Sequence, residues 1–496
     1  MSERFVNALK KENNYTLTEN GAVALKSTNS ALVDLFGQIG SMRKRTDADI
    51  ESAFSKAFAE DRLLATKMAF YARNIRGGLG ERRTARIIFR FLARLYPEVM
   101  RKNIQFVPLF GRYDDLYEFV GTPVENDMWR LIQEQWNLDI KNMKDNQPIS
   151  LLAKWLKSVN TSSQESNKLG KLTAKMLGMS EKEYRKSLSA LRRYLDVTEV
   201  KMSGNKWSEI NYAGVPSRAM SIYRNAFRKH DEDRFNAYIE SVSKGEAKIN
   251  SSTLFPYDIL EKMGLTTWRG DYLTVNHYDK VLEEQWKALP NYIEGENNVL
   301  IMADTSESME GRPMATAIGL AIYFAERNKG VFKDVFMTFS EKPSFVQLKG
   351  NTLYEKIKCI PSIVENTNLE AAFKLILDTA IRNNLTAEDM PKSLVVISDM
   401  EFDRATYNYN TSKYETFYES MVRMYNQHGY TMPNVIFWNV DSRHDNFQVT
   451  SEYRGVQLAS GQFPSVFKSI LNNIGKTPYE AMLSVLNNPI YDCIAV

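Results

Sequence analysis

The chain has 496 residues and a formal net charge of +4, with 43% hydrophobic and 25% charged residues. This composition is that of a globular protein and excludes disordered and collagen-like chains. The length exceeds what one hydrophobic core usually serves, so we expect two or three domains.

Two cysteines, Cys359 and Cys493, are too few for a disulfide framework, and the four histidines show no zinc-ligand spacing. This usage favours a reducing compartment. The sequence has no apolar run long enough to span a membrane, and its first residues are charged rather than signal-like. We therefore expect a cytoplasmic protein with no membrane partner.

The net charge is distributed unevenly along the chain. The first 290 residues carry a net charge of +10, whereas the residues from Asn291 onward carry −6. A basic front half suggests a polyanion or an acidic partner. The alternative is that the basic and acidic halves attract each other.

Residues 1–290 are expected to form a basic α-helical domain. From Leu32 to Trp286, apolar residues recur at steps of three and four, and breakers such as Gly77-Gly78 and Pro97 separate the segments. Short helices joined by tight turns predict stacked helical pairs, a solenoid or HEAT-like layer. The sequence shows no clear repeat of fixed period.

The pattern changes near Pro290, and residues 296–496 are expected to form a doubly wound α/β domain. The apolar run Val299–Ala303 is typical of a fully buried parallel strand. Strands then alternate with amphipathic helices, which indicates an open, mostly parallel sheet. The further strands are predicted at Val335–Phe339, Ser344–Gln347, Leu394–Ser398, Val435–Asn439 and Val456–Ala459. The helices are predicted at Pro313–Asn328, Leu369–Ile381, Tyr414–Gln427 and Pro464–Ile474.

Three polar loops should meet at the carboxyl edge of this sheet, where doubly wound domains bind ligands. The loop after the first strand carries Asp304, Ser306 and Ser308 at alternate positions. Thr367 precedes a helix and offers another hydroxyl, and Asp399 follows a buried strand and offers a second carboxylate, directly or through water. Such hard oxygen ligands suit Mg²⁺ best, with Mn²⁺ and Ca²⁺ as alternatives. The alternative is that Asp304 and Ser306 only cap a helix or turn.

This order of residues resembles the metal-ion-dependent adhesion site of von Willebrand A domains. The resemblance implies a von Willebrand A-like, Rossmann-like domain with metal ligands at Asp304, Ser306, Ser308, Thr367 and Asp399. Glu307 departs from the pattern, because a small glycine often lies between the two serines. Its charge, with that of nearby Glu310, can tighten cation binding or crowd an acidic ligand.

The helical half resembles an uncharacterised family of the DUF2828 type, which joins a helical domain to a von Willebrand A-like domain. The resemblance rests on Arg73–Arg82 (RNIRGGLGER), Pro108–Leu116 (PLFGRYDDL), Ala153–Leu156 (AKWL), Tyr184–Lys186 with Leu191-Arg192, and Phe255–Asp258 (FPYD). The layout is also remotely similar to the Ro ribonucleoprotein, in which a TROVE domain of helical repeats carrying RNA is closed by a von Willebrand A domain.

A stripe of arginines is the candidate RNA-binding feature. Arg82, Arg86, Arg90 and Arg94 repeat every four residues on one side of a predicted helix, and Arg76 lies in the glycine-rich turn before it. Guanidiniums in a row suit phosphate oxygens, and the turn offers backbone N–H groups to an anion. The alternative is a solvated helix face with acidic neighbours.

The sequence shows no catalytic arrangement, so we expect a non-enzymatic binding scaffold. The first hypothesis is binding of structured RNA by the basic helical domain. The second is a metal-dependent protein–protein interaction module in assembly or quality control. The third is a metal-dependent nuclease, in which acids such as Glu307, Glu310, Glu401 and Asp403 would join Asp399.

Overall fold

The computed structural model describes residues 9–10, 12–266, 272–339, 342–362, 367–404 and 415–496. The chain begins with a short antiparallel hairpin of β1 (Tyr15–Leu17) and β2 (Val23–Leu25), followed by α2 (Ala31–Phe36). The hairpin was not predicted from the sequence, which was read as helical from the start. Its strands have three residues each, too short for a clear alternating pattern.

The helical character predicted for the N-terminal region is confirmed. Helices begin at the capping residues that their sequences supply, as in the reciprocal caps of Thr46 with Asp49 and of Ser180 with Glu183. The helices are α3 (Asp47–Glu60), α4 (Arg62–Arg73), α5 (Arg83–Leu95), α6 (Pro97–Asn103), α7 (Val107–Phe110), α8 (Glu125–Lys144), α9 (Leu152–Trp155), α10 (Gln164–Met176), α11 (Glu181–Tyr194), α12 (Thr198–Ser203), α13 (Ser217–His230), α14 (Glu232–Ser243), α15 (Pro256–Met263) and α16 (Lys280–Lys287). A small ribbon of β3 (Leu265–Thr266) and β4 (Thr274–Val275) separates the last two.

The C-terminal part is an α/β domain around a mixed sheet, as predicted. Its elements are β5 (Val299–Asp304), α17 (Arg312–Arg327), β6 (Val335–Phe339), β7 (Ser344–Gln347), α18 (Leu353–Ile357), α19 (Leu369–Arg382), β8 (Ser393–Ser398), α20 (Phe417–Gln427), β9 (Asn434–Asn439), β10 (Val456–Ser460), α21 (Val466–Asn472) and α22 (Pro478–Leu486). The strand order is β10-β9-β8-β5-β6-β7, and β7 alone among the sheet's paired strands runs antiparallel.

The central strands β5 and β8 are buried along their whole length, which explains their continuous apolar sequences. From this pair the chain proceeds to β6 on one side and to β9 and β10 on the other. The strand order therefore reverses between β5 and β8. Ligands of open α/β sheets bind beyond the carboxyl ends of the strands at such a point.

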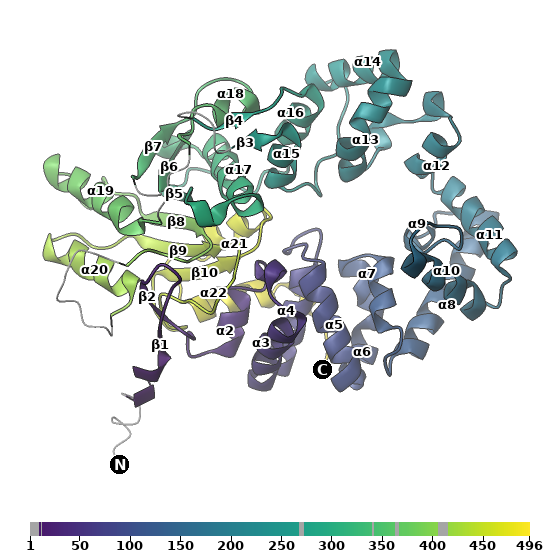
Figure 1. The fold of residues 1–496 in the computed structure, drawn as a ribbon, viewed down its shortest axis with the longest axis horizontal. Coiled ribbons are helices and arrows are strands. Elements are labelled where there is room, and N and C mark those ends of the chain that lie inside the picture. Colours follow the sequence, from purple (N-terminus) through teal and green to yellow (C-terminus); the bar gives the residue numbers. More distant parts are fainter. Residues whose placement is uncertain (1–8, 11, 267–271, 340–341, 363–366, 405–414) are drawn as a thin grey trace.

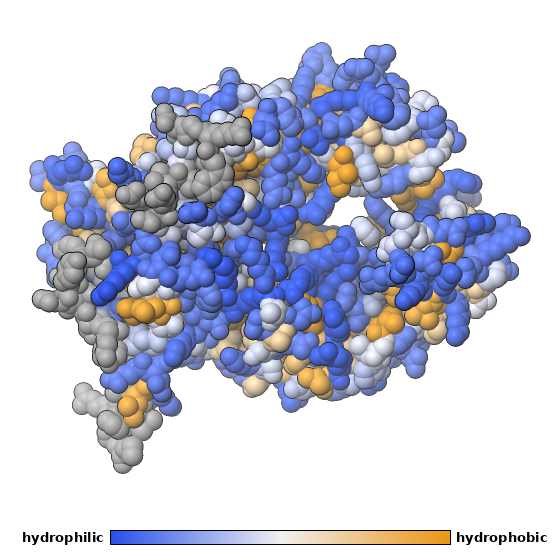
Figure 2. Space-filling model, in the orientation of Figure 1, coloured by the Kyte–Doolittle hydropathy of each residue, from blue (hydrophilic) through white to orange (hydrophobic). Residues whose placement is uncertain are grey.

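The helices form an arc whose two ends both meet the α/β domain, so the molecule is a closed ring (Figure 1). At one junction α15 packs on α17 so closely that a Cβ at Gly319 would lie 2.9 Å from Cβ of Pro256. At the other junction α2 packs on β10 and α22, and α22 packs on α4. Figure 2 shows an opening through the molecule between the arc and the α/β domain.

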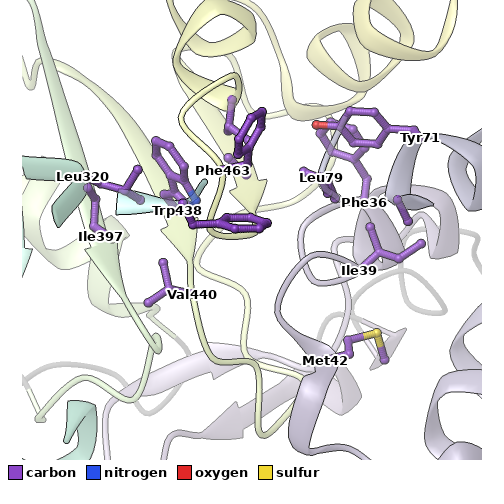
Figure 3. Packing of buried hydrophobic residues seen from close by; sticks show 14 of the residues in the cluster. Phe36, Ile39, Met42, Tyr71, Leu79, Leu320, Ile397, Trp438, Val440 and Phe463 are labelled. Atoms are coloured by element: carbon purple, nitrogen blue, oxygen red, sulfur yellow. The ribbon is translucent and has the colours of Figure 1, made fainter. Parts of the chain in front are cut away.

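The hydrophobic core is continuous across the second junction. Phe36 and Ile39 of the N-terminal segment lie opposite Trp438 and Phe463 of the α/β domain (Figure 3), and all four belong to one buried cluster. A Cβ at Gly40 would lie 2.6 Å from the backbone of Gly461, so the two segments meet at backbone distance. Within the described residues, no helix is long and apolar enough to cross a membrane.

Candidate metal centre

Asp304 is the last residue of β5, and the chain then turns into a short 3-10 helix that carries Ser308. The backbone N–H of Ser306 donates to Oδ1 of Asp304 at 2.9 Å, and the hydroxyls of Ser306 and Ser308 lie 3.2 Å apart. Asp304 thus caps this turn, which agrees with the alternative interpretation of the sequence for this residue. Ser306 stands at the N-cap of the 3-10 helix but makes no capping hydrogen bond with its side chain, so its hydroxyl is not used as a cap.

The end of the neighbouring strand β8 supplies the second carboxylate. Ser398 Oγ donates to Oδ2 of Asp304 at 2.6 Å, and the side chain of Asp399 accepts a hydrogen bond from Ser308. Directly after Asp399, Met400 has a φ of +69°, a left-handed conformation that is uncommon for a residue with a side chain. This strained turn directs Asp399 back toward the loop that follows β5.

Thr367 joins the same region from the segment before α19. Its carbonyl accepts from the N–H of Asp403, which ties it to the loop after β8. Its hydroxyl accepts from Nδ2 of Asn20 at 3.3 Å, and the residue is buried. The three loops named from the sequence are therefore linked to one another by hydrogen bonds.

Two carboxylates, Asp304 and Asp399, lie buried beside each other in this region. Burial raises the pKa of both carboxyls above the ordinary range, and repulsion from Asp399 raises the pKa of Asp304 further. A buried pair of this kind is costly unless cations compensate it. The guanidinium of Arg443 supplies one positive charge, with Nη2 at 2.5 Å from Oδ2 of Asp399. Carboxylates and hydroxyls are the donors that Mg²⁺, Mn²⁺ and Ca²⁺ prefer, so the donor set fits such an ion.

Glu401 lies two residues beyond Asp399 but serves a different purpose. Its buried carboxylate accepts from the amide of Asn446, from the backbone N–H of Glu19 and from the ring of His444. These bonds tie the N-terminal hairpin and the loop after β9 to the sheet. Glu401 also forms a group with Glu19 and His444 in which the ligand atoms all lie within 4.8 Å of one another.

The arginine stripe lies on α5, as predicted, but each of its guanidiniums faces an acid. The ion pairs, with N–O distances of 2.6 to 3.1 Å, are Arg82–Asp114, Arg86–Asp115, Arg90–Glu118 and Arg94–Glu51. Arg76 donates to the carbonyl of Leu109. The alternative of acidic neighbours therefore describes this face in the structure, and the RNA role of these residues stays a prediction.

The glycine-rich turn before α5 is folded around Asn74. The N–H groups of Gly77, Gly78 and Gly80 donate to the side chain or carbonyl of Asn74, and that of Leu79 donates to Tyr71. The expectation that this turn offers its amides to an anion is wrong for these four groups. A Cβ at Gly78 would lie 2.2 Å from the carbonyl oxygen of Tyr71, so close packing explains this glycine.

Comparison with known proteins agrees with this two-part layout. A family model described as "Domain of unknown function (DUF2828)" matches residues 18–147 and 126–298. The chain belongs to the DUF2828 family. In this DUF2828 member, residues 298–485 match a second model, described as "Domain of unknown function (DUF7788)", which begins where β5 begins. "Uncharacterized protein L728" of Acanthamoeba polyphaga mimivirus is 30% identical over 526 residues, covering 96% of this chain and 89% of that protein.

Sequence reasoning missed three residues of this DUF2828 chain that contact the site. Ser398 was placed at the end of a strand and the start of the third loop but was given no role, although its position next to Asp399 was a usable signal. Arg443 and Asn20 lie in loops far from the motif, and no local pattern distinguishes them. They reach the site only through the fold.

Proposed function

We propose that this chain is a non-enzymatic scaffold whose C-terminal domain is of the von Willebrand A type and binds a protein partner through a divalent cation, most favourably Mg²⁺. The observation that carries the proposal is the convergence of Asp304 and Asp399 at the point where the strand order reverses. Ser306, Ser308 and Thr367 add hydroxyls from the adjoining loops. The mostly parallel sheet with one antiparallel edge strand supports the same domain type.

A binding role is favoured over hydrolysis by the surroundings of the two carboxylates. A two-metal hydrolase needs further carboxylates that are free to bind a second ion. Here Glu401 is engaged by Asn446 and His444, and Glu307 is exposed on the outer side of its turn. A single cation held by two carboxylates and three hydroxyls can instead accept one further oxygen from a partner.

Calorimetric titration of the full-length chain with Mg²⁺ and with Mn²⁺ tests the proposal. We expect one bound ion, and we expect Asp304→Asn to weaken binding at least about 100-fold, since even residues behind the ligands cost about 10–100-fold. Asp139→Asn is the matched control, because Asp139 is a fully buried carboxylate in α8, remote in sequence, that Ser150 and Gln135 satisfy. Equal binding by the parent and Asp304→Asn chains would reject the assignment.

Binding of structured RNA is the second candidate, favoured by one observation. A groove of about 380 Å³ on α5 is lined by four arginines, two acids and one apolar residue: Arg82, Arg83, Arg86, Arg90, Asp47, Glu118 and Ile87. The side chains of Arg82, Arg83 and Arg90 stay 51%, 43% and 41% exposed despite their ion pairs. Phosphates can reach these exposed guanidiniums and compete with their carboxylate partners, and a salt series with filter binding tests whether they do.

A further inference from the structure

The tip of the N-terminal hairpin lies on the loop that follows β8. Thr18 Oγ1 donates to the carbonyl of Phe402 at 2.6 Å, and Asn20 Nδ2 donates to the carbonyl of Glu401 at 2.7 Å. The N–H of Arg404 donates back to the carbonyl of Asn20 at 3.2 Å. The tip, residues 18–21, thus occupies the edge of the sheet where the candidate metal ligands lie.

Asn20 also touches one of those ligands. The same Nδ2 atom lies 3.3 Å from the hydroxyl of Thr367, which is 1% exposed. One of the residues proposed to bind the cation is therefore contacted by the chain's own hairpin.

Glu19 adds a carboxylate to the tip, and one arginine connects it to the site. Arg443 Nη1 lies 2.9 Å from the carboxylate of Glu19, and Nη2 of the same guanidinium lies 2.5 Å from Asp399. Glu19 is 43% exposed, whereas Asp399 is fully buried. Arg443 therefore bridges an accessible acid of the hairpin and a buried acid of the candidate metal site.

The base of the hairpin is held much more firmly than its tip. Leu25 and Phe447 exchange two backbone hydrogen bonds at 2.7 and 2.9 Å, and Ala22, Ala24 and Leu25 are buried. The tip contributes hydrogen bonds to the loop after β8 and an ion pair of the exposed Glu19 carboxylate, and such contacts each stabilise less than buried apolar packing. The tip can leave the edge while the base stays anchored.

We infer that the hairpin tip is an intramolecular ligand of the sheet edge that carries the candidate metal ligands, here called the metal face. An acidic protein segment in extended conformation binds this face by displacing the tip. The inference rests on the proposed function, since it assigns the partner's chemistry at that site. A displacing segment needs a carboxylate for Arg443 and main-chain or amide groups for the carbonyls of Glu401 and Phe402. The hairpin lowers the affinity of such a partner until its tip is released.

A peptide with the hairpin's own sequence, Tyr15–Leu25 (YTLTENGAVAL), is the probe. We expect the fluorescently labelled peptide, with Mg²⁺, to bind the full-length Glu19→Ala/Asn20→Ala variant at least tenfold more tightly than the parent. Adding Arg443→Gln to that variant should remove the gain. The matched control is Glu12→Ala/Asn13→Ala, which makes the same changes of charge and amide outside the tip and should bind the peptide as the parent does.

Equal peptide affinity for the parent and the tip variant overturns the inference, as does a gain that survives Arg443→Gln. Mg²⁺ calorimetry on the same samples separates this failure from that of the proposed function. If the chain binds Mg²⁺ through Asp304 but the peptide does not discriminate, only the hairpin inference fails; if Mg²⁺ does not bind, the proposed function fails. Glu19→Gln alone, a milder change at an exposed side chain, gives the same comparison should the double variant unfold.

Discussion

Nε of Arg73 lies 2.8 Å from Oδ2 of Asp115, and the two side chains are 2% and 0% exposed. Arg73 opens the RNIRGGLGER segment and Asp115 lies in PLFGRYDDL, so this ion pair joins the two longest segments on which the family resemblance rested. A Cβ at Gly111 would lie 2.3 Å from Oδ2 of Asp115. The glycine of the second segment is therefore required by the packing of this pair.

Asp115→Ala should lower the free energy of unfolding by about 3–5 kcal/mol, because it leaves the charge of Arg73 buried and uncompensated. Denaturant unfolding of the full chain measures the loss. Asp127→Ala is the control. It pairs with the exposed side chains of Arg101 and Arg130 and should cost less than about 1 kcal/mol. Similar losses for the two variants would contradict a structural role for the buried pair.

Cation binding should stabilise the parent chain. An ion present at about 100 times its dissociation constant adds about 2.7 kcal/mol to the free energy of unfolding of a state that alone binds it. We therefore expect Mg²⁺ to raise the melting temperature of the parent and of Ser393→Ala but not of Asp304→Asn. Ser393 is a suitable serine control, since it is buried in β8 and its hydroxyl makes no hydrogen bond with a described residue.

Asp34 should make the stability of the chain depend on pH. Burial raises its pKa to about 6, although Ser27 and Thr28 donate hydrogen bonds to the carboxylate. The folded state therefore holds a proton that the unfolded state releases near pH 4. This contribution to stability is complete below pH 4 and is lost as the pH rises through about 6.

Asp34→Asn, which imitates the protonated form, should remove this dependence and gain up to about 2 kcal/mol relative to the parent at pH 7.5. Melting temperatures of both chains between pH 4 and pH 7.5 test whether the parent loses stability as the pH rises and Asp34→Asn does not. A parent whose stability changes between these pH values in the same way as that of Asp34→Asn would show that Asp34 does not titrate there.

Closure of the ring at the C-terminus should depend on Tyr491. Its ring stacks on Phe110 at 5.5 Å, and its hydroxyl accepts from Asn74 at 3.0 Å. Tyr491→Ala should destabilise the chain by about 3–5 kcal/mol and Tyr491→Phe by about 1 kcal/mol. Ile490→Ala, at a neighbouring side chain that is 49% exposed, should have little effect. Hydrogen exchange of α4 shows whether the loss is local to the junction.

If RNA binds along α5, its affinity should fall with salt. Four phosphate contacts imply a slope of about −3 when the logarithm of the binding constant is plotted against the logarithm of the salt concentration. Changing Arg82, Arg86, Arg90 and Arg94 to Gln should abolish the slope, whereas Asp304→Asn should leave it unchanged. Because the same four changes remove Arg82 and Arg86 from Asp114 and Asp115, which then keep Arg112 and Arg73, respectively, circular dichroism must accompany the binding data. A parent that binds no RNA at low salt would leave the stripe as a set of structural ion pairs.

The elements of the α/β domain were largely predictable because most of its strands are buried apolar runs bounded by polar residues. The predicted bounds of β6 and β7 agree with the structure at both ends, and the predicted α19 ends one residue too early. The hairpin of β1 and β2 was missed because its strands gain their order from Phe447 and Glu401, more than 380 positions away. For the same reason Asn20 and Arg443 carry no local signal, and the acids that face α5 come from other segments. Sequence periodicity shows which side of a helix is polar but not which charges will face it.

The ring closure also determines the order in which the chain can fold during synthesis. The hairpin and α2 leave the ribosome more than 400 residues before hydrogen-bonding partners such as Phe447 and Ser460 are made. The last residues in turn return to α6, where Ala495 exchanges two hydrogen bonds with Asn103. The side of α2 that packs on β10 and α22 therefore stays uncovered until those elements are made, although α3 and α4 can cover its other side early. Chains stalled or truncated before β10 should aggregate through this segment, so chaperone binding is expected to concentrate at the N-terminus of the nascent protein.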